Sequence, residues 1–226
     1  MLAVQDIRSG LQEAQTLRQV FATVSASSCP KYLNFHLHTI FSDGKLLPTD
    51  LVDQALAMGI KHFAITDHHS LGGYFVARDY LQTLGAPHQS QLWVGVEINA
   101  SLLFTEVHIL GYAFDPYHPA IQPYVQGKPT AGLDYQALNV IQAIHTAGGL
   151  AVLAHPARYR RTPEELIPAA AAIGLDGVET YYGYDNSDPW MPSIKQTEQI
   201  CILAKQYGLF STCGTDSHGY KITRRL

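Results

Sequence analysis

Apolar residues along the chain occur in short runs that alternate with longer amphipathic segments. The runs are four to seven residues long and predict buried strands. The segments between them place apolar residues three or four positions apart, as helices do, and several end at a glycine, the usual residue just after a helix. Strands are predicted at residues 33–37, 62–66, 92–98, 107–112, 150–154, 177–180 and 209–213, and helices at 48–58, 73–84, 135–147, 163–173 and 192–207.

This alternation of strand and helix favours parallel pairing and an α/β fold. The third and fourth predicted strands are the exception. Only residues 99–106 separate them, too few for a helical crossover, so they should form an antiparallel hairpin. About seven strands with helices outside indicate a closed or nearly closed barrel, and an open doubly wound sheet is the alternative.

The N-terminal segment predicts a further helix, from Val4 to Thr23. Leu17, Val20 and Phe21 fall near one face of it, together with Leu11. Serines and Pro30 end the pattern. We therefore divide the chain into an N-terminal helical extension, residues 1–30, and one α/β domain, residues 31–226.

Composition narrows the classes of function. With 226 residues, 46% of them hydrophobic, the chain can bury one sizeable core. A net charge of −4 argues against binding nucleic acid through the overall field, but permits a small phosphorylated ligand. Three scattered cysteines indicate no disulfide framework. No run resembles a signal peptide or a membrane span, so we expect a cytoplasmic protein, with no membrane or protein partner evident.

Histidine is the unusual component, with 11 residues against 15 Lys and Arg together. Histidines and acids gather where predicted strands end, the edge at which α/β proteins bind ligands. Any one histidine could have a structural role, but so many at one edge are hard to explain by coincidence. The candidate metal ligands are His36, His38, Asp43, His68, Glu97, His108, His155, Asp216 and His218.

Their spacing agrees with a metal site. His36 and His38 are two residues apart in an extended segment, so both side chains point to one face. His108 begins a strand, but in an antiparallel hairpin it would face Glu97. Glu97 can bridge two ions through its two oxygens. Imidazole with carboxylate favours Mn, Zn or Fe, and two or three such divalent ions would attract a phosphate monoester and activate water.

Three further residues are candidates for the reaction itself. Arg158, three residues after His155, could hold a substrate phosphate. Asp67 ends the second predicted strand, and we favour a role in orienting a ligand over direct metal binding. The general acid could be a metal-bound water, His218 or Asp67, and spacing does not decide among them. Glu179 ends the sixth predicted strand without an identified partner.

The motifs resemble those of the PHP family (polymerase and histidinol phosphatase domain). Six segments occur in family order and span nearly the whole chain after the N-terminal helix. They are NFHLHTIFSDG, ITDHHS, GVEI, VHILGY, AHPARY and GTDSHG. The resemblance implies a distorted (β/α)7 barrel with a site for two or three metal ions.

The resemblance also implies roles for single residues. His36 and His38 match ligands of a first metal, shared with Glu97 and Asp216. Glu97 would bridge to a second metal held by His108 and His155. The ligands of a third are matched by Asp43, His68 and His218. Arg158 matches an arginine that contacts substrate phosphate in the branch acting on small nucleotides.

Within the family the chain is most similar to that stand-alone branch, whose members include 3′,5′-bisphosphonucleotide phosphatases and 5′-3′ exonucleases of short RNA. The expected substrate is therefore a nucleotide or a short oligonucleotide. One departure is that only a short loop, residues 120–134, stands where the branch carries a helical insertion. The alternatives are a histidinol-phosphate phosphatase and a non-catalytic metal-binding module, although every matched ligand position is present.

Overall fold

The structure, a computed structural model, describes residues 2–85 and 89–226, with the side chains of residues 2–11 excluded. Helices and strands alternate along most of it. The helices are α1 (Leu2–Phe21), α2 (Pro48–Met58), α3 (Gly72–Thr83), α4 (Ala137–Thr146), α5 (Pro163–Ala172) and α6 (Ile194–Gln206), with short 3-10 turns at Gln122–Tyr124 and Pro156–Arg158. The strands are β1 (Leu33–Asn34), β2 (His62–Ala64), β3 (Gln91–Trp93), β4 (Gly95–Leu102), β5 (Thr105–Tyr112), β6 (Leu150–Leu153), β7 (Gly177–Tyr181) and β8 (Phe210–Cys213).

The strands form two sheets. One contains β1, β2 and β3, all parallel, and the other has the order β4-β5-β6-β7-β8. In the second sheet β5 runs antiparallel to both its neighbours, and the remaining pairs are parallel. The predicted α/β class and the predicted hairpin are therefore confirmed. The strands are not assigned to one closed barrel among the described residues.

The third predicted strand, residues 92–98, is in fact two strands, and this expectation was wrong. The chain leaves the first sheet after Trp93 and enters the second at Gly95. A Cβ atom at Gly95 would lie 2.7 Å from the carbonyl oxygen of Ile65. Glycine thus permits the close approach of backbones where the two sheets meet, which an apolar run alone does not reveal.

Backbone contacts join the two sheets at both edges. At one edge Phe35 N–H donates to the carbonyl of Cys213 (3.0 Å), and Asp216 N–H donates to the carbonyl of His36 (2.9 Å). At the other edge His69 N–H donates to the carbonyl of Glu97 (2.9 Å). These bonds bring the ends of β1, β2 and β8 to the start of β4, so residues from distant parts of the sequence lie close together there.

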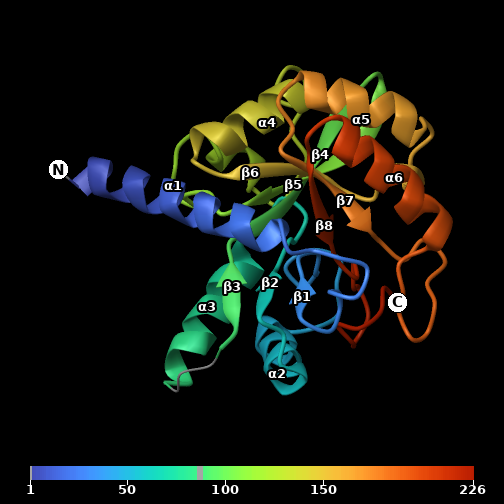
Figure 1. Ribbon diagram of the computed structural model, residues 1–226. Helices are drawn as coiled ribbons and strands as arrows, with labels where there is room; N and C mark the ends of the chain where they lie inside the picture. Colours follow the sequence, from blue (N-terminus) through green and yellow to red (C-terminus); the bar gives the residue numbers. More distant parts are fainter. Residues whose placement is uncertain (1, 86–88) are drawn as a thin grey trace.

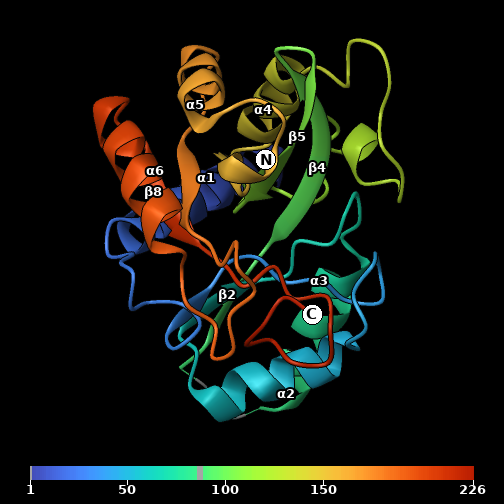
Figure 2. The ribbon, with the colours of Figure 1, turned by 90° about the vertical axis from the view of Figure 1, so that its right-hand side faces the viewer.

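Helices cover the outside of the sheets (Figure 1). Figure 2 shows α4, α5 and α6 against the larger sheet and α2 and α3 beside the smaller one. Helix α1 packs through Leu17 and Phe21, both buried, and the Phe21 ring lies 5.0 Å from that of Phe35. Arg18 also pairs with Asp176 at 2.7 Å. No helix within the described part of the chain has the length and apolar character needed to span a membrane.

The β4–β5 hairpin ends in a two-residue turn, Leu103 and Phe104. Both residues have positive φ, 51° and 59°, a conformation that normally requires Asn or Gly in such turns. Phe104 is also fully exposed, so its ring gains no burial. The turn therefore carries backbone strain of roughly 1–2 kcal/mol per residue.

We expect Phe104→Gly to raise the free energy of unfolding by about 1 kcal/mol, because glycine relieves the strain at that position. The matched control is Phe104→Ala, which removes the ring but keeps the Cβ atom that causes the strain. Urea denaturation would measure both variants. Equal stability of the two would show that the turn is not strained.

Candidate metal centre

The functional site is arranged around the carboxylate of Glu97, which is buried near the start of β4. Its Oε2 atom lies 2.9 Å from Nε2 of His36 and 3.1 Å from Nε2 of His38. Its Oε1 atom lies 2.7 Å from Nδ1 of His108 and 3.3 Å from Nε2 of His155. Each oxygen thus faces its own pair of imidazoles, the arrangement expected of a bridging ligand.

A second carboxylate completes the group at His36 and His38. Oδ1 of Asp216 lies 3.3 Å from Nε2 of His36 and 3.2 Å from Nε2 of His38. The four potential ligand atoms of His36, His38, Glu97 and Asp216 lie within 4.8 Å of one another, and all four residues are buried.

The β4–β5 hairpin provides an imidazole, that of His108, for the Oε1 atom of Glu97. Its register pairs Asn99 with His108, which places His108 beside Glu97, as the sequence predicted. His68, at the end of β2, joins Glu97 and His108 in a second group of potential ligand atoms within 4.8 Å of one another. His155 follows β6, the other neighbour of β5, and its Nε2 atom faces the same Glu97 oxygen as His108.

A third group lies nearer the surface. Asp43, in the loop after β1, has a half-exposed carboxylate. Its Oδ2 atom lies 3.2 Å from Nε2 of His218 and 3.8 Å from Nε2 of His68. His38 completes this group of potential ligand atoms. The three adjoining groups therefore contain eight of the nine candidate ligands, and the ninth, His155, faces the Glu97 carboxylate at 3.3 Å.

The distances between these atoms suit shared metal ions, and the two shortest, His36–Glu97 and His108–Glu97, are also direct hydrogen-bond contacts. Two ligands held roughly 2.1 Å from one ion lie about 3.0–3.4 Å apart, as most of these pairs do. Nε2 of His38 is buried and lies 3.1 and 3.2 Å from two carboxylate oxygens, yet it has no hydrogen-bond partner in suitable geometry. A buried nitrogen without a partner is costly, and coordination to a cation would satisfy it.

The electrostatics of the site show the same requirement for positive charge. Burial acts to lower the pKa of His38, but the nearby carboxylates of Asp216 and Glu97 prevail and raise the pKa to about 9. The pKa of His36 is likewise well above its usual range, because the charges of Glu97, Glu179 and Asp216 outweigh burial. Without metal, protons on these imidazoles neutralise the carboxylates.

His68 behaves differently. Burial lowers the pKa of His68 to about 4, and the nearby His38 and His108 act in the same direction. Burial also lowers the pKa of His155. These two imidazoles are therefore already neutral at pH 7, the form in which histidine binds a metal ion.

Glu179 holds two residues of the site in place. Its Oε1 atom lies 3.0 Å from Nδ1 of His36, and its Oε2 atom accepts the backbone N–H of His155 at 2.9 Å. A carboxylate on the far nitrogen of a metal-binding imidazole fixes the ring and its tautomer. The sequence placed Glu179 at a strand end but could not identify this partner, because 143 positions separate it from His36.

Asp67 is fully buried and does not line the cavity described below. Its Oδ1 atom accepts the N–H of Thr39 at 2.7 Å and the hydroxyl of Ser42 at 2.7 Å. Its Oδ2 atom accepts the hydroxyl of Thr39 at 2.6 Å. These bonds fix the loop that carries Asp43.

The backbone is strained at two of the nine candidates. His155 has φ 26° and Asp216 has φ 51°, conformations that cost roughly 1–3 kcal/mol each and gather at functional sites. Gly214 precedes Asp216 and leaves room for its neighbours. A Cβ atom there would lie 2.2 Å from Cβ of His36 and 2.9 Å from Oε1 of Glu179.

Seven of the nine candidate ligands, all except His36 and His38, border a cavity of about 260 Å³, a volume suited to a small ligand. Arg158, the predicted phosphate contact, lines it, and its Nη1 atom donates to Oδ2 of Asp216 at 3.1 Å. Tyr182 donates its hydroxyl to the same oxygen at 2.6 Å. Arg225, which the sequence reasoning did not identify, also lines the cavity and reaches Asp216.

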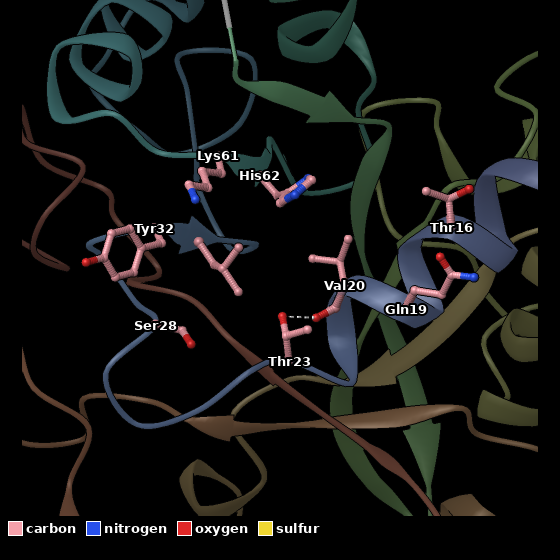
Figure 3. A pocket seen from close by; sticks show the side chains of 9 residues that line it. Thr16, Gln19, Val20, Thr23, Ser28, Tyr32, Lys61 and His62 are labelled. Carbon is pink, nitrogen blue, oxygen red and sulfur yellow. Dashed lines mark hydrogen bonds between the residues drawn. The ribbon is translucent and has the colours of Figure 1, made fainter.

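A larger cavity, of about 430 Å³, lies elsewhere, between α1 and the start of β2. Figure 3 shows Thr16, Gln19 and Val20 of α1 on one side of it and Tyr32, Lys61 and His62 on the other. Its lining contains no carboxylate and one imidazole. The chemistry therefore belongs to the smaller cavity.

Comparison with known proteins identifies the family. The model of the PHP domain matches residues 34–221, which include every candidate ligand. The chain belongs to the PHP domain family. It is accordingly a metal-dependent phosphoesterase, and its three clusters have the residues of a multi-metal site.

The PHP relatives include enzymes that act on nucleic acids and nucleotides. The chain is 34% identical to the 5′-3′ exoribonuclease Rnm of Salmonella typhimurium, with 87% of this chain and 88% of that protein covered. It is 26% identical to the 5′-3′ exoribonuclease of Haemophilus influenzae (83% and 90% covered). With the 3′,5′-nucleoside bisphosphate phosphatase of Chromobacterium violaceum it shares 24% identity (82% and 87% covered).

The fold agrees with solved structures. An amidohydrolase of Chromobacterium violaceum with bound sulfate and no metal superposes with a TM-score of 0.68, at 24% identity, covering 83% of this chain and 87% of that one. The alignment with the Haemophilus relative spans 258 positions, more than the 226 residues of this PHP domain protein. The relative therefore contains residues that have no counterpart in this chain.

We expect Glu179→Gln to weaken metal binding by roughly 10- to 100-fold, the usual effect of removing such an orienting carboxylate. Activity should return when metal is added in excess, because the ligands themselves remain. Glu198→Gln, an exposed acid on α6, is the control. Titration calorimetry with Mn²⁺ would measure both variants, and unchanged affinity in Glu179→Gln would contradict the orienting role.

Proposed function

We propose that this PHP domain protein hydrolyses a phosphate monoester of a nucleotide or short oligonucleotide, as a 3′,5′-bisphosphonucleotide phosphatase or a 5′-3′ exonuclease. The observation that carries the proposal is the Glu97 carboxylate between two pairs of imidazoles, beside a cavity that two arginines line. The named activities of the Salmonella, Haemophilus and Chromobacterium relatives support the substrate class. We also interpret the two joined sheets as the distorted (β/α)7 barrel that the motifs imply, with β3 and β4 together in the place of the third predicted strand.

The proposed ligand sets are those that the family motifs imply. His36, His38, Glu97 and Asp216 would hold one ion, and Glu97 with His108 and His155 would hold a second. Asp43, His68 and His218 would hold a third. Imidazoles with carboxylates suit Mn, Zn or Fe. When bound, such ions supply Lewis acidity, which polarises the phosphoester and lowers the pKa of water.

The remaining roles belong to the side chains of this chain. Arg158 binds a phosphate through its guanidinium group, one nitrogen of which already bonds to Asp216. Of the two acid candidates only His218 lines the cavity, since the oxygens of Asp67 are occupied by Thr39 and Ser42. We therefore assign His218 as the group that protonates the leaving oxygen when two ions are bound, and Asp67 as a positioning residue.

A substrate panel tests the proposal. Protein loaded with Mn²⁺ is assayed for phosphate release from adenosine 3′,5′-bisphosphate, short 5′-phosphorylated RNA and histidinol phosphate, with His155→Ala as the inactive control. The proposal expects turnover of the first or the second. Turnover of histidinol phosphate alone would contradict the proposed nucleotide substrate and favour a histidinol-phosphate phosphatase. A relative from Thermotoga maritima, named as a probable histidinol-phosphatase, is 33% identical over 57% of both chains.

A further inference from the structure

The two oxygens of Asp216 face different surroundings. Oδ1 faces Nε2 of His36 and of His38, at 3.3 and 3.2 Å. Oδ2 faces the other way and accepts hydrogen bonds from Tyr182 (2.6 Å), Arg158 (3.1 Å) and Arg225 (2.8 Å). Oδ1 of this carboxylate therefore belongs to the candidate metal centre, and Oδ2 binds two guanidinium groups beside that centre.

Arg225 is fixed in this position by the segment that follows β8. The backbone N–H of His218 donates to the carbonyl of Arg225 at 2.7 Å. Ile222, between them in sequence, is fully buried, and its N–H donates to the Gln54 side chain at 3.1 Å. The segment thus folds back over the site, and the position of Arg225 does not depend on the arginine side chain alone.

The guanidinium group of Arg225 retains hydrogen-bonding capacity. It contacts Asp216 through Nε, and its two Nη groups have no hydrogen-bond partner among the described residues. Its side chain is 22% exposed and lines the same cavity as Arg158. A guanidinium group bound through Nε alone still presents N–H donors suited to phosphate oxygens.

Charge gives the chemical class of the ligand. Arg158 and Arg225 place two permanent positive charges on one carboxylate oxygen, and the other oxygen of that carboxylate is directed at the candidate metal centre. One negative charge cannot balance both arginines and contribute to a metal site. A dianionic group beside the two arginines would restore the balance, and phosphate is the group that the reaction class supplies.

We propose that Arg158 and Arg225 form a second phosphate subsite, which binds the phosphate that is not cleaved, so that the substrate carries two phosphates. This inference rests on the proposed function. The scissile phosphate lies at the candidate metal centre, on the Oδ1 side of Asp216, and the second phosphate lies on the Oδ2 side. Arg225 is then a specificity-determining residue for bisphosphorylated nucleotides.

Arg225→Ala, Arg225→Lys and Arg224→Ala test the subsite. Arg224 is the matched control, because it is adjacent in sequence but exposed and bonded to Asp188. The substrates are adenosine 3′,5′-bisphosphate and the 3′- and 5′-monophosphates. For the bisphosphate, Arg225→Ala should raise KM by roughly 10- to 100-fold, the range for a lost charge-assisted contact, with little change in kcat. The Lys variant should recover part of the loss.

The monophosphates separate binding from support of the fold. If Arg225 only positioned Asp216, Arg225→Ala would lower kcat equally for bisphosphate and monophosphate and reduce the metal content, and that result would overturn the subsite. The subsite instead predicts that Arg225→Ala loses much more kcat/KM for the bisphosphate than for the monophosphate that still carries the scissile ester, and that metal content measured by mass spectrometry is retained.

Direct binding provides a readout without turnover. The nucleoside monophosphate product retains the phosphate that the subsite holds, so its Kd, measured by titration calorimetry, should rise by roughly 10- to 100-fold in Arg225→Ala and stay unchanged in Arg224→Ala. Equal Kd values in all variants would overturn the inference. Failure of the wild type to cleave any nucleotide would overturn the proposed function instead, and the calorimetric comparison would still decide the subsite.

Discussion

Glu97→Gln is expected to abolish phosphoesterase activity, with a loss of kcat/KM of roughly 10³-fold or more, the upper range for one electrostatic group in an active site. The side chain keeps its shape but loses the negative charge that lies between His36, His38, His108 and His155. A neutral amide presents one acceptor oxygen and one donor nitrogen, so it cannot face imidazole pairs on both sides. Steady-state kinetics and metal analysis of the purified variant would measure the effect.

The comparison with Glu179→Gln makes this result specific. Glu179 is equally buried but contacts Nδ1 of His36, the nitrogen that does not face Glu97. Excess metal should therefore restore the activity of Glu179→Gln but not that of Glu97→Gln. Circular dichroism should show both variants folded. Activity of Glu97→Gln within tenfold of wild type would contradict a bridging role, since the lost charge would then have no part in the reaction.

Removal of the metal ions is expected to have the second large effect, on stability as well as activity. Each ion at 100 times its Kd stabilises the folded state by about 2.7 kcal/mol, so chelation should lower the thermal midpoint and abolish turnover. Added Mn²⁺ should restore both. A midpoint that does not respond to chelator or metal would contradict a multi-metal centre.

The pH dependence of metal binding follows from the raised pKa values of His36 and His38. Nearby carboxylates raise the pKa of His38 to about 9, and that of His36 is also well above its usual range. At pH 7 both imidazoles of the metal-free protein therefore carry protons, which a metal ion must displace. Metal affinity should increase as the pH rises from 6 towards 9 and then level off.

Calorimetry in two buffers of different ionisation enthalpy would count the protons released when Mn²⁺ binds. We expect at least one proton at pH 7 and fewer above pH 9. The control is Glu198→Gln, an exposed acid on α6 outside the candidate ligands, which should leave the proton count unchanged. No proton release at pH 7 would show that the imidazoles are already neutral in the metal-free protein.

The sequence by itself determined the order of the elements, the α/β class, the hairpin and the candidate ligands. These features depend on local patterns, since the periodicity of apolar residues identifies each element and strand ends mark the binding edge. That rule brought His36, His155 and Asp216 to one edge before any distance was known, whereas Glu97 lies near the start of β4 and not at a strand end. His108 followed from the length of a single connection.

Only the tertiary structure decided the features that depend on contacts between distant segments. The break after Trp93 depends on the approach of two backbones at Gly95, and the role of Glu179 depends on His36, 143 positions away. Arg225 reaches Asp216 because burial of Ile222 folds the last segment over the site. No local pattern encodes these contacts, because they form only when separate elements pack around one core. The same contacts decide which groups line the substrate site.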